Sequence, residues 1–170
     1  MSAHDPTDPV ELFRSLAPAL ALYARQWTPS HAEDVVHDVF VRLIEITQSG
    51  KRLPEDPRAW LFRSVRNAAI STLRSGARRK RREGAISDAS PRWFEPNVDD
   101  LIDAAAAQRA MESLPDEQRE IVVLRVWASL GFQEIADVVG VSVSTAFERY
   151  SKALAAMKLK LEAGHVRRRA

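Results

Sequence analysis

The chain has 170 residues, of which 45% are hydrophobic, so it is long enough for one medium-sized domain or two small ones with buried cores. It contains no cysteine, which excludes disulfides, thiol catalysis and cysteine-ligated zinc, and no apolar run of about 18 residues that could cross a bilayer. Its net charge is only +2, yet two acidic segments (residues 1–50, net −4, and 84–120, net −6) alternate with two basic ones (51–83, net +8, and 121–170, net +4), which indicates two surfaces that face a polyanion.

The first helix is predicted to begin at Asp8 and Pro9, since aspartate caps helix N-termini and proline is favoured in the first turn. Apolar residues follow at steps of three or four as far as Trp27, which is the period of an amphipathic helix. Pro18 lies within this run and is expected to kink or split the helix, because proline removes a backbone hydrogen bond.

Two further helices are predicted before the middle of the chain. Ser30 and Glu33 have the spacing of a capping box, and an apolar stripe follows until Gly50 ends the helix. Pro57, which follows an aspartate, starts a third helix that we expect to close at Gly76. No segment alternates apolar and polar residues for long, so no strand is predicted.

The second half of the chain begins with a segment that has no periodicity. Residues 84–98 hold glycine, serine and proline and are interpreted as a linker. Helices are predicted after Asp99, after Pro115, and over residues 132–139 and 143–161. The apolar residues of the last helix recur at steps of 4, 3, 4, 3 and 4, which predicts one buried stripe. That stripe consists of Val143, Phe147, Tyr150, Leu154, Met157 and Leu161.

These elements predict an all-α protein with two small helical domains. The first domain is expected to span residues 8–83, and the second is expected to span residues 99–162 after the linker at 84–98. A chain of this kind has room for one functional surface on each domain.

The clearest local motif is a helix-turn-helix at residues 132–145. Ala136 is small enough for two helices to cross closely, Gly140 permits the positive φ of the turn, and Ser142 caps the second helix. Such a motif places the start of its second helix in the DNA major groove, although a helical hairpin that binds nothing is the alternative. The side chains predicted to point outward are Ser144, Thr145, Glu148, Arg149 and Lys152.

The third predicted helix carries a basic face that is separate from its apolar face. Arg63, Arg66, Asn67 and Arg74 line up on this face, and a basic run follows at residues 78–82. From Pro57 to Arg74 the helix would be about 27 Å long, which matches several phosphate spacings of DNA. A solvated basic tail is the alternative explanation.

Four segments together resemble a known family. Residues 32–43 (AEDVVHDVFVRL) and 57–68 (PRAWLFRSVRNA) are similar to conserved region two of the small extracytoplasmic-function (ECF) sigma factors of bacterial RNA polymerase. Residues 114–125 and the helix-turn-helix resemble region four of the same proteins. The resemblance covers about residues 8–83 and 99–162, and it is far more specific than the helix-turn-helix alone.

The resemblance implies a protein without catalytic activity or cofactor that acts in the bacterial cytoplasm. Its implied partners are core RNA polymerase, through the β′ clamp helices and the β flap, promoter DNA and an anti-sigma factor, with no insertion into a membrane. The residues implied to contact β′ are Asp34, His37, Asp38 and Arg42. Those implied to contact the −10 element are Lys51, Arg52 and Leu53, near a flipped base, and Arg63, Arg66, Asn67, Arg74, Arg78 and Arg79. Those implied to contact the −35 element are Ser144, Thr145, Glu148, Arg149 and Lys152.

The recognition helix departs from the family pattern at two positions. Many members have a basic residue where Phe147 stands and a small polar residue where Glu148 stands. The helix is therefore poorer in positive charge, and Glu148 is able to accept a hydrogen bond from a cytosine amino group.

Two other classes of protein share part of this pattern. A stand-alone helix-turn-helix regulator would explain the second domain but not the basic third helix. A metal-dependent enzyme would use the cluster His31, Glu33, Asp34, His37 and Asp38, for which no second helix supplies further ligands.

Overall fold

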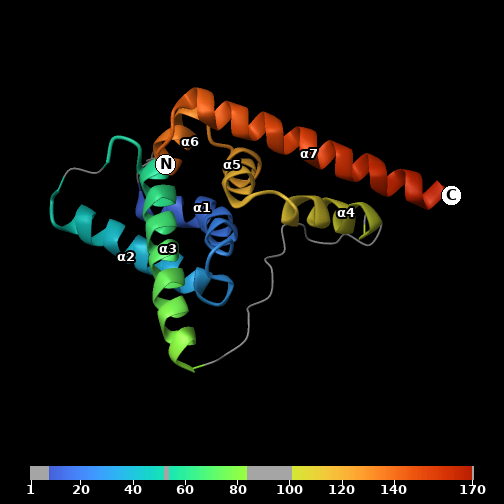
Figure 1. Cartoon of the computed structure of the whole chain (residues 1–170). Coiled ribbons are helices and arrows are strands. Elements are labelled where there is room, and N and C mark those ends of the chain that lie inside the picture. The colour runs from blue at the N-terminus through green and yellow to red at the C-terminus, as the bar shows by residue number, and fades with distance from the viewer. Residues whose placement is uncertain (1–7, 52–53, 84–100, 170) are drawn as a thin grey trace. The chain divides into compact units, whose positions relative to one another are not determined.

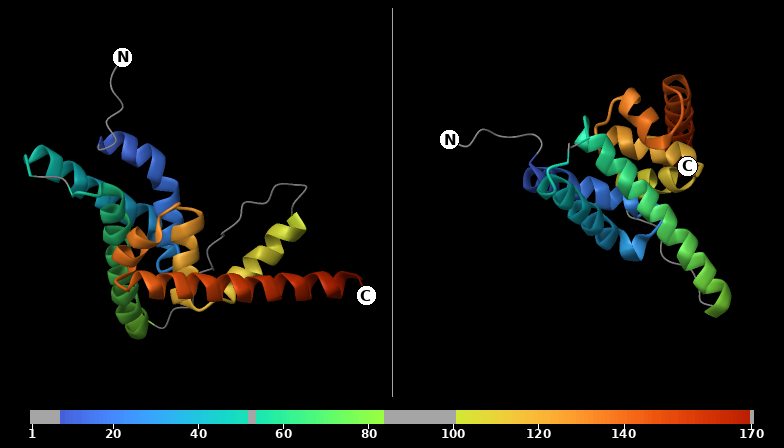
Figure 2. Two further views of the ribbon diagram at one scale, coloured as in Figure 1. Left: turned by 90° about the horizontal axis from the view of Figure 1, so that it is seen from above. Right: turned by 90° about the vertical axis from the view of Figure 1, so that its left-hand side faces the viewer.

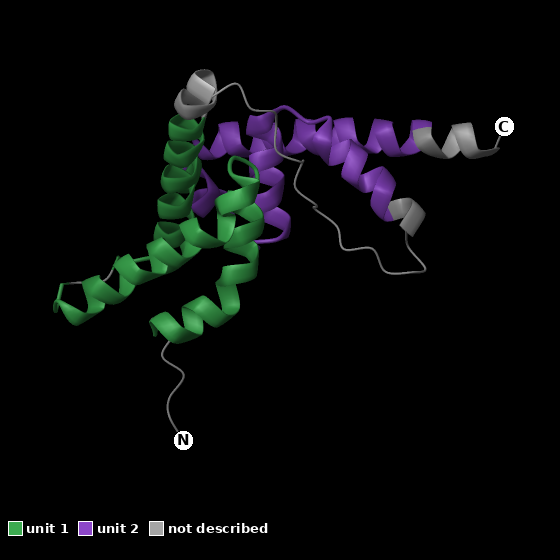
Figure 3. Ribbon diagram, turned by 90° about the horizontal axis from the view of Figure 1, so that it is seen from below, with its two compact units in different colours: residues 1–89, 137–139 green, residues 90–136, 140–170 purple. Residues whose placement is uncertain are grey.

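The computed structural model describes residues 8–51, 54–83 and 101–169, and its helices are labelled in Figure 1. The chain divides into two compact units, one made of residues 1–89 with 137–139 and the other of residues 90–136 with 140–170 (Figure 3). Each unit is helical, and the prediction of an all-α protein is confirmed for the described residues.

The first unit contains α1 (Pro9–Ala24), a short 3₁₀ turn (Pro29–His31), α2 (Ala32–Gln48) and α3 (Pro57–Glu83). The predicted caps at the starts of α1 and α3 are confirmed. The backbone N–H of Val10 donates to Asp8 Oδ1 at 3.1 Å, and that of Ala59 donates to Asp56 Oδ1 at 2.9 Å. Gly50, with φ of 67°, follows the end of α2 as predicted.

α1 continues through Pro18 as one helix, so the proline does not split it. Two expectations for this unit are wrong in detail. Gly76 does not close α3, because it adopts helical φ and the arginine-rich run behind it consists of good helix formers. α2 begins at Ala32 with His31, rather than Ser30, as its N-cap, and the His31 side chain makes no capping bond, so the predicted N-cap position is wrong. The Oε1 atom of Glu33 accepts instead from Arg25 Nη2 at 2.5 Å.

The core of the first unit lies where its three helices meet (Figure 2). The ring of Tyr23 on α1 is fully buried and meets Phe62 of α3 edge to face, with ring centroids 5.6 Å apart. Leu43 of α2 and Val65 of α3 are also fully buried. Because the apolar faces turn inward, the charged faces of α2 and α3 are left on the surface.

The second unit contains α4 (Leu101–Glu112), α5 (Asp116–Val126), most of α6 (Phe132–Val139), whose residues 137–139 are grouped with the first unit, and α7 (Val143–Arg169). α7 packs against both α4 and α5 (Figure 2). Arg119 stabilises the α4–α5 turn, since its guanidinium donates to the carbonyl oxygens of Met111 at 3.1 Å and Leu114 at 2.7 Å. Met111 lies in the last turn of α4, where carbonyls lack the usual helical donor four residues on, and Leu114 lies in the turn beyond the helix.

The buried stripe expected along α7 is wrong. The side chains of Val143, Phe147 and Leu154 are exposed, and the inner face is built around Ala146 and Ala153, both fully buried. Small residues allow α7 to approach its neighbours closely, and the other apolar residues of the expected stripe, Tyr150, Met157 and Leu161, are only half-buried.

No helix among the described residues is long and apolar enough to cross a membrane.

Candidate functional site

The outer face of α2 carries four polar side chains that are all exposed: Asp34, His37, Asp38 and Arg42. The Oδ2 atom of Asp34 lies 3.6 Å from Nδ1 of His31. Within the described part of the chain, the side chains of Asp38 and Arg42 have no ion-pair partner, so their charges face solvent. The four residues implied to contact β′ therefore form one continuous surface.

An apolar groove lies beside this surface, between α1 and α2, with a volume of about 250 Å³. Val10 is 59% exposed at its rim, and Phe13 meets Phe40 edge to face with centroids 4.9 Å apart. Large apolar side chains exposed together indicate a surface that binds a partner. The lining residues are Pro9, Val10, Phe13, His37, Phe40, Val41 and Ile44.

The basic face of α3 has the arrangement that its spacing predicts. Arg63, Asn67 and Arg74 are exposed along the helix, and Arg66 is half-buried beside them. Arg78 and Arg79 continue α3, but their side chains lie outside the described residues. The described part of the face presents donors to solvent over three turns of helix.

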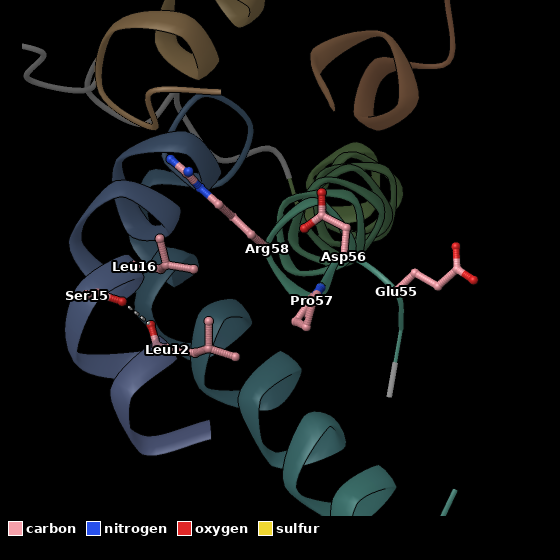
Figure 4. A pocket seen from close by; sticks show the side chains of 7 residues that line it. All are labelled: Leu12, Ser15, Leu16, Glu55, Asp56, Pro57 and Arg58. Atoms are coloured by element: carbon pink, nitrogen blue, oxygen red, sulfur yellow. Dashed lines mark hydrogen bonds between the residues drawn. The ribbon is translucent and has the colours of Figure 1, made fainter. Parts of the chain in front are cut away.

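The loop before α3 is described only in part. Lys51 is exposed, whereas Arg52 and Leu53 lie outside the described residues. Behind the loop, α1 and the start of α3 enclose a pocket of about 450 Å³, with Leu12 and Leu16 on one side and Pro57 on the other (Figure 4). The pocket is also lined by Ser15, Glu55, Asp56 and Arg58.

The helix-turn-helix has the predicted turn. Gly140 has φ of 80°, and its N–H donates to the carbonyl of Ala136 at 2.8 Å. The N–H of Thr145 donates to Ser142 Oγ at 3.1 Å, so Ser142 caps α7 as expected. These local bonds fix the angle at which α7 begins.

Two of the cations predicted to point outward from α7 are held by carboxylates. Arg149 is half-buried, with Nη2 2.6 Å from Glu117 Oε2 of α5. Lys152 Nζ lies 2.6 Å from Glu148 Oε1, and this hydrogen bond lowers the pKa of Glu148. Ser144 is exposed on the outer side, so the surface at the start of the helix offers hydroxyls and a carboxylate more than free positive charge.

Reasoning from the sequence missed the exposed apolar residues of both units. The sequence pattern places Phe147 in the buried stripe of the last helix, and it assigns Val10, Phe13 and Val41 to no site. A signal was available for the groove, because apolar residues of the first two helices cover a wider arc than one buried stripe requires. No group of three or more His, Asp or Glu side chains among the described residues is arranged to hold a metal ion.

Comparison with known families gives two matches along the chain. Residues 12–79 match the model of sigma-70 region 2, and residues 104–157 match that of sigma-70 region 4. The chain therefore belongs to the sigma-70 family of RNA polymerase sigma factors, which are not enzymes. It is a sigma factor of the ECF type, and it directs transcription initiation.

Similar proteins agree with this assignment. SigV, an RNA polymerase sigma factor of Bacillus subtilis (strain 168), is 23% identical over 130 residues, which are 76% of this chain and 75% of that protein. The ECF sigma factor EcfG of Rhodopseudomonas palustris (strain TIE-1) is 29% identical over 128 residues, 72% of this chain and 66% of EcfG. The sigma factor RpoE of Bartonella quintana, solved in complex with the anti-sigma factor NepR, has the same fold, with a TM-score of 0.71 at 22% identity over 90% of this chain and 95% of that one.

Proposed function

We propose that this sigma factor docks on core RNA polymerase through α2, opens the −10 element with α3 and reads the −35 element with α7. The observation that carries the proposal is that both sigma regions occur on one chain and that each has an exposed polar helix face. We assign residues 8–83 to the region 2 domain, 84–98 to the linker and 99–162 to the region 4 domain.

The α2 surface is assigned to the β′ clamp helices. The exposed charges of Asp34, Asp38 and Arg42 provide polar contacts, and the apolar groove next to His37 supplies the hydrophobic area that a stable interface needs at its centre. A helix of the polymerase that carries both apolar and charged residues suits this combination. The β flap is assigned to the region 4 domain on the resemblance alone.

The α3 surface is assigned to the melted −10 region. Arg63 and Arg74 are positioned along one side of α3, where they attract the backbone of a separated strand, and Asn67 offers an amide to a base edge. Lys51 with Arg52 and Leu53 would lie near a flipped base, and Arg66, Arg78 and Arg79 would extend the basic track.

The α7 surface is assigned to the −35 duplex. Its first two turns carry Ser144, Thr145, Glu148, Arg149 and Lys152, and a recognition helix contacts base edges with the residues near its N-terminus.

An anti-sigma factor is proposed as a regulatory partner, because RpoE, which shares the fold, was solved with one. We place the protein in the bacterial cytoplasm, where RNA polymerase and promoter DNA are found.

The test is transcription by core polymerase, the full chain and a library of promoter fragments, with Asp38→Arg beside a matched charge reversal, Glu112→Arg. Both acids are exposed, but only Asp38 lies on the proposed β′ surface. The wild type and Glu112→Arg should direct initiation, while Asp38→Arg should compete poorly for core enzyme with its helical circular dichroism unchanged. Equal competition by the two variants would contradict the docking surface. Tight, selective duplex binding without polymerase would instead support the stand-alone regulator.

A further inference from the structure

Phe147 is an exposed aromatic side chain at the DNA-reading end of α7. Its side chain is 57% exposed, and it lies one turn from Ser144 and one turn from Ser151, both exposed. The buried face of the helix is formed by Ala146 and Ala153. Phe147 lies outside that buried face, and more than half of its side chain is open to solvent.

The ring is held in place by an aromatic cluster. It meets Phe132 of α6 edge to face, with centroids 5.3 Å apart and planes at 76°. Phe132 is fixed in turn by Tyr150, with centroids 5.5 Å apart, and by the Arg125 guanidinium 5.2 Å from its ring centre. Phe147 thus presents a rigid apolar surface and loses little conformational entropy when a ligand covers it.

The neighbouring cations are already engaged. Arg149 pairs with Glu117 and Lys152 pairs with Glu148, each at 2.6 Å. The exposed surface around Phe147 is accordingly an apolar ring among hydroxyls rather than a cluster of free positive charges. Such a surface is better suited to contact base edges on the floor of the DNA major groove than the phosphates along its sides.

We propose that Phe147 contacts the 5-methyl group of a thymine in the upstream promoter element and selects thymine at that position. The methyl group of thymine is the apolar group that the base pairs expose in the major groove, and aromatic side chains contact it favourably. Cytosine has no such group, so the contact distinguishes the two pyrimidines. The inference rests on the proposed function of α7 as the reader of the −35 duplex.

The experiment removes the methyl group from the DNA and the ring from the protein. The probe is the duplex that the full chain with core polymerase selects from a random library, with each upstream thymine replaced in turn by deoxyuridine. In the wild type, one replacement should weaken binding by about fourfold, the value expected for burial of one methyl group. Phe147→Ala should bind the thymine duplex about fourfold more weakly and lose its sensitivity to that replacement. If deoxyuridine weakens binding equally in the wild type and in Phe147→Ala, the contact is overturned.

Leu154→Ala is the matched control, since Leu154 is 44% exposed two turns further along the same side of α7. This variant should keep the full sensitivity to deoxyuridine. Phe147→Leu keeps an apolar side chain and should retain part of the sensitivity to deoxyuridine. It replaces Phe147→Ala in the test if the alanine variant has an altered circular dichroism spectrum. If the wild-type complex prefers a specific duplex but binds equally well after every replacement by deoxyuridine, the thymine contact alone is overturned. Absence of any sequence preference in the duplex would overturn both the contact and the proposed role of α7.

Discussion

Arg149 in α7 and Glu117 in the first turn of α5 are joined by an ion pair of 2.6 Å between Nη2 and Oε2. The arginine side chain is 26% exposed, whereas that of Glu117 lies largely in solvent. The pair engages one guanidinium nitrogen and leaves the others available as donors. Arg149 is therefore oriented by α5 before any DNA is present.

Arg149→Ala should relax base preference at one upstream position, because a bidentate pair with guanine discriminates by about 1–3 kcal/mol. Glu117→Gln should weaken the same preference by less, since it removes only the negative charge of the group that orients the arginine. Binding of full-chain holoenzyme to a series of base-substituted duplexes measures both effects. Arg149→Ala should still melt a template with a pre-opened bubble, and failure there would contradict its assignment to the upstream element.

Replacing Arg66 and Asn67 by alanine should impair strand opening and leave upstream base preference unchanged. The reason is that both residues lie on the face of α3 assigned to the separated strand. Permanganate footprinting of the promoter reports melting directly. A shift in upstream preference without a melting defect would show that the roles of α3 and α7 have been exchanged.

The salt dependence of promoter binding tests the basic run at the end of α3. Replacing Arg78, Arg79, Arg81 and Arg82 by alanine should flatten the log–log slope of affinity against salt by up to about 4, at roughly one unit per phosphate contact. The effect should be similar on unrelated sequences. The arginine run at residues 167–169 provides the control, and its replacement should leave the slope unchanged. Equal slopes for the wild type and the first variant would mean that the run does not follow the DNA.

The ion pair between Arg25 and Glu33 predicts a pH dependence of stability. The hydrogen bond from Arg25 lowers the pKa of Glu33 in the folded chain, so its stabilising contribution is present above the ordinary glutamate pKa and is lost as the pH falls through the lowered value. The Glu33 side chain is 62% exposed and that of Arg25 is 40% exposed, so solvent screens the pair and Glu33→Gln should cost at most about 1 kcal/mol at pH 7. Urea unfolding at pH 7 and pH 3 should show the difference between the two proteins shrinking in acid. Glu45→Gln, at an exposed position, should show no such change.

Two glycine-to-alanine substitutions should change the free energy of unfolding in opposite directions. Gly140→Ala should destabilise the region 4 domain by about 1 kcal/mol, because its φ of 80° is unfavourable for alanine. Gly76→Ala should stabilise α3 by about 0.5–1 kcal/mol, because Gly76 lies within the helix and an added Cβ meets no atom within 4 Å. Denaturant unfolding of the full chain measures both. A stabilising Gly140→Ala would mean that the turn readily adopts another conformation.

Local chemistry explains which parts of the fold could be predicted from the sequence. The caps at Asp8 and Ser142 and the turn at Gly140 depend on residues within a few positions of one another, and all three were predicted. The exposure of Phe147 could not be predicted from a heptad spacing, because the spacing does not tell whether large residues or the alanines between them face inward. The Arg149–Glu117 pair joins positions far apart in the chain and depends on tertiary packing.

The same distinction applies to the functional surfaces. Residue spacing was sufficient to place Arg63, Asn67 and Arg74 on one face of α3. The wide apolar arcs of the first two helices indicated surplus apolar surface, but spacing could not place the groove beside His37, because the groove depends on how α1 and α2 pack together.

Because α7 is continuous, the rotational position of its proposed base-reading residues is fixed relative to that of its packing residues. The residues proposed to read bases and the residues that pack against α4 and α5 belong to one unbroken helix. Inserting a single residue between Phe147 and Ala153 would turn one set by about 100° relative to the other, since a helix completes a turn in 3.6 residues. Changes of length should therefore be excluded from this stretch, and the choice of promoter should vary through substitutions alone.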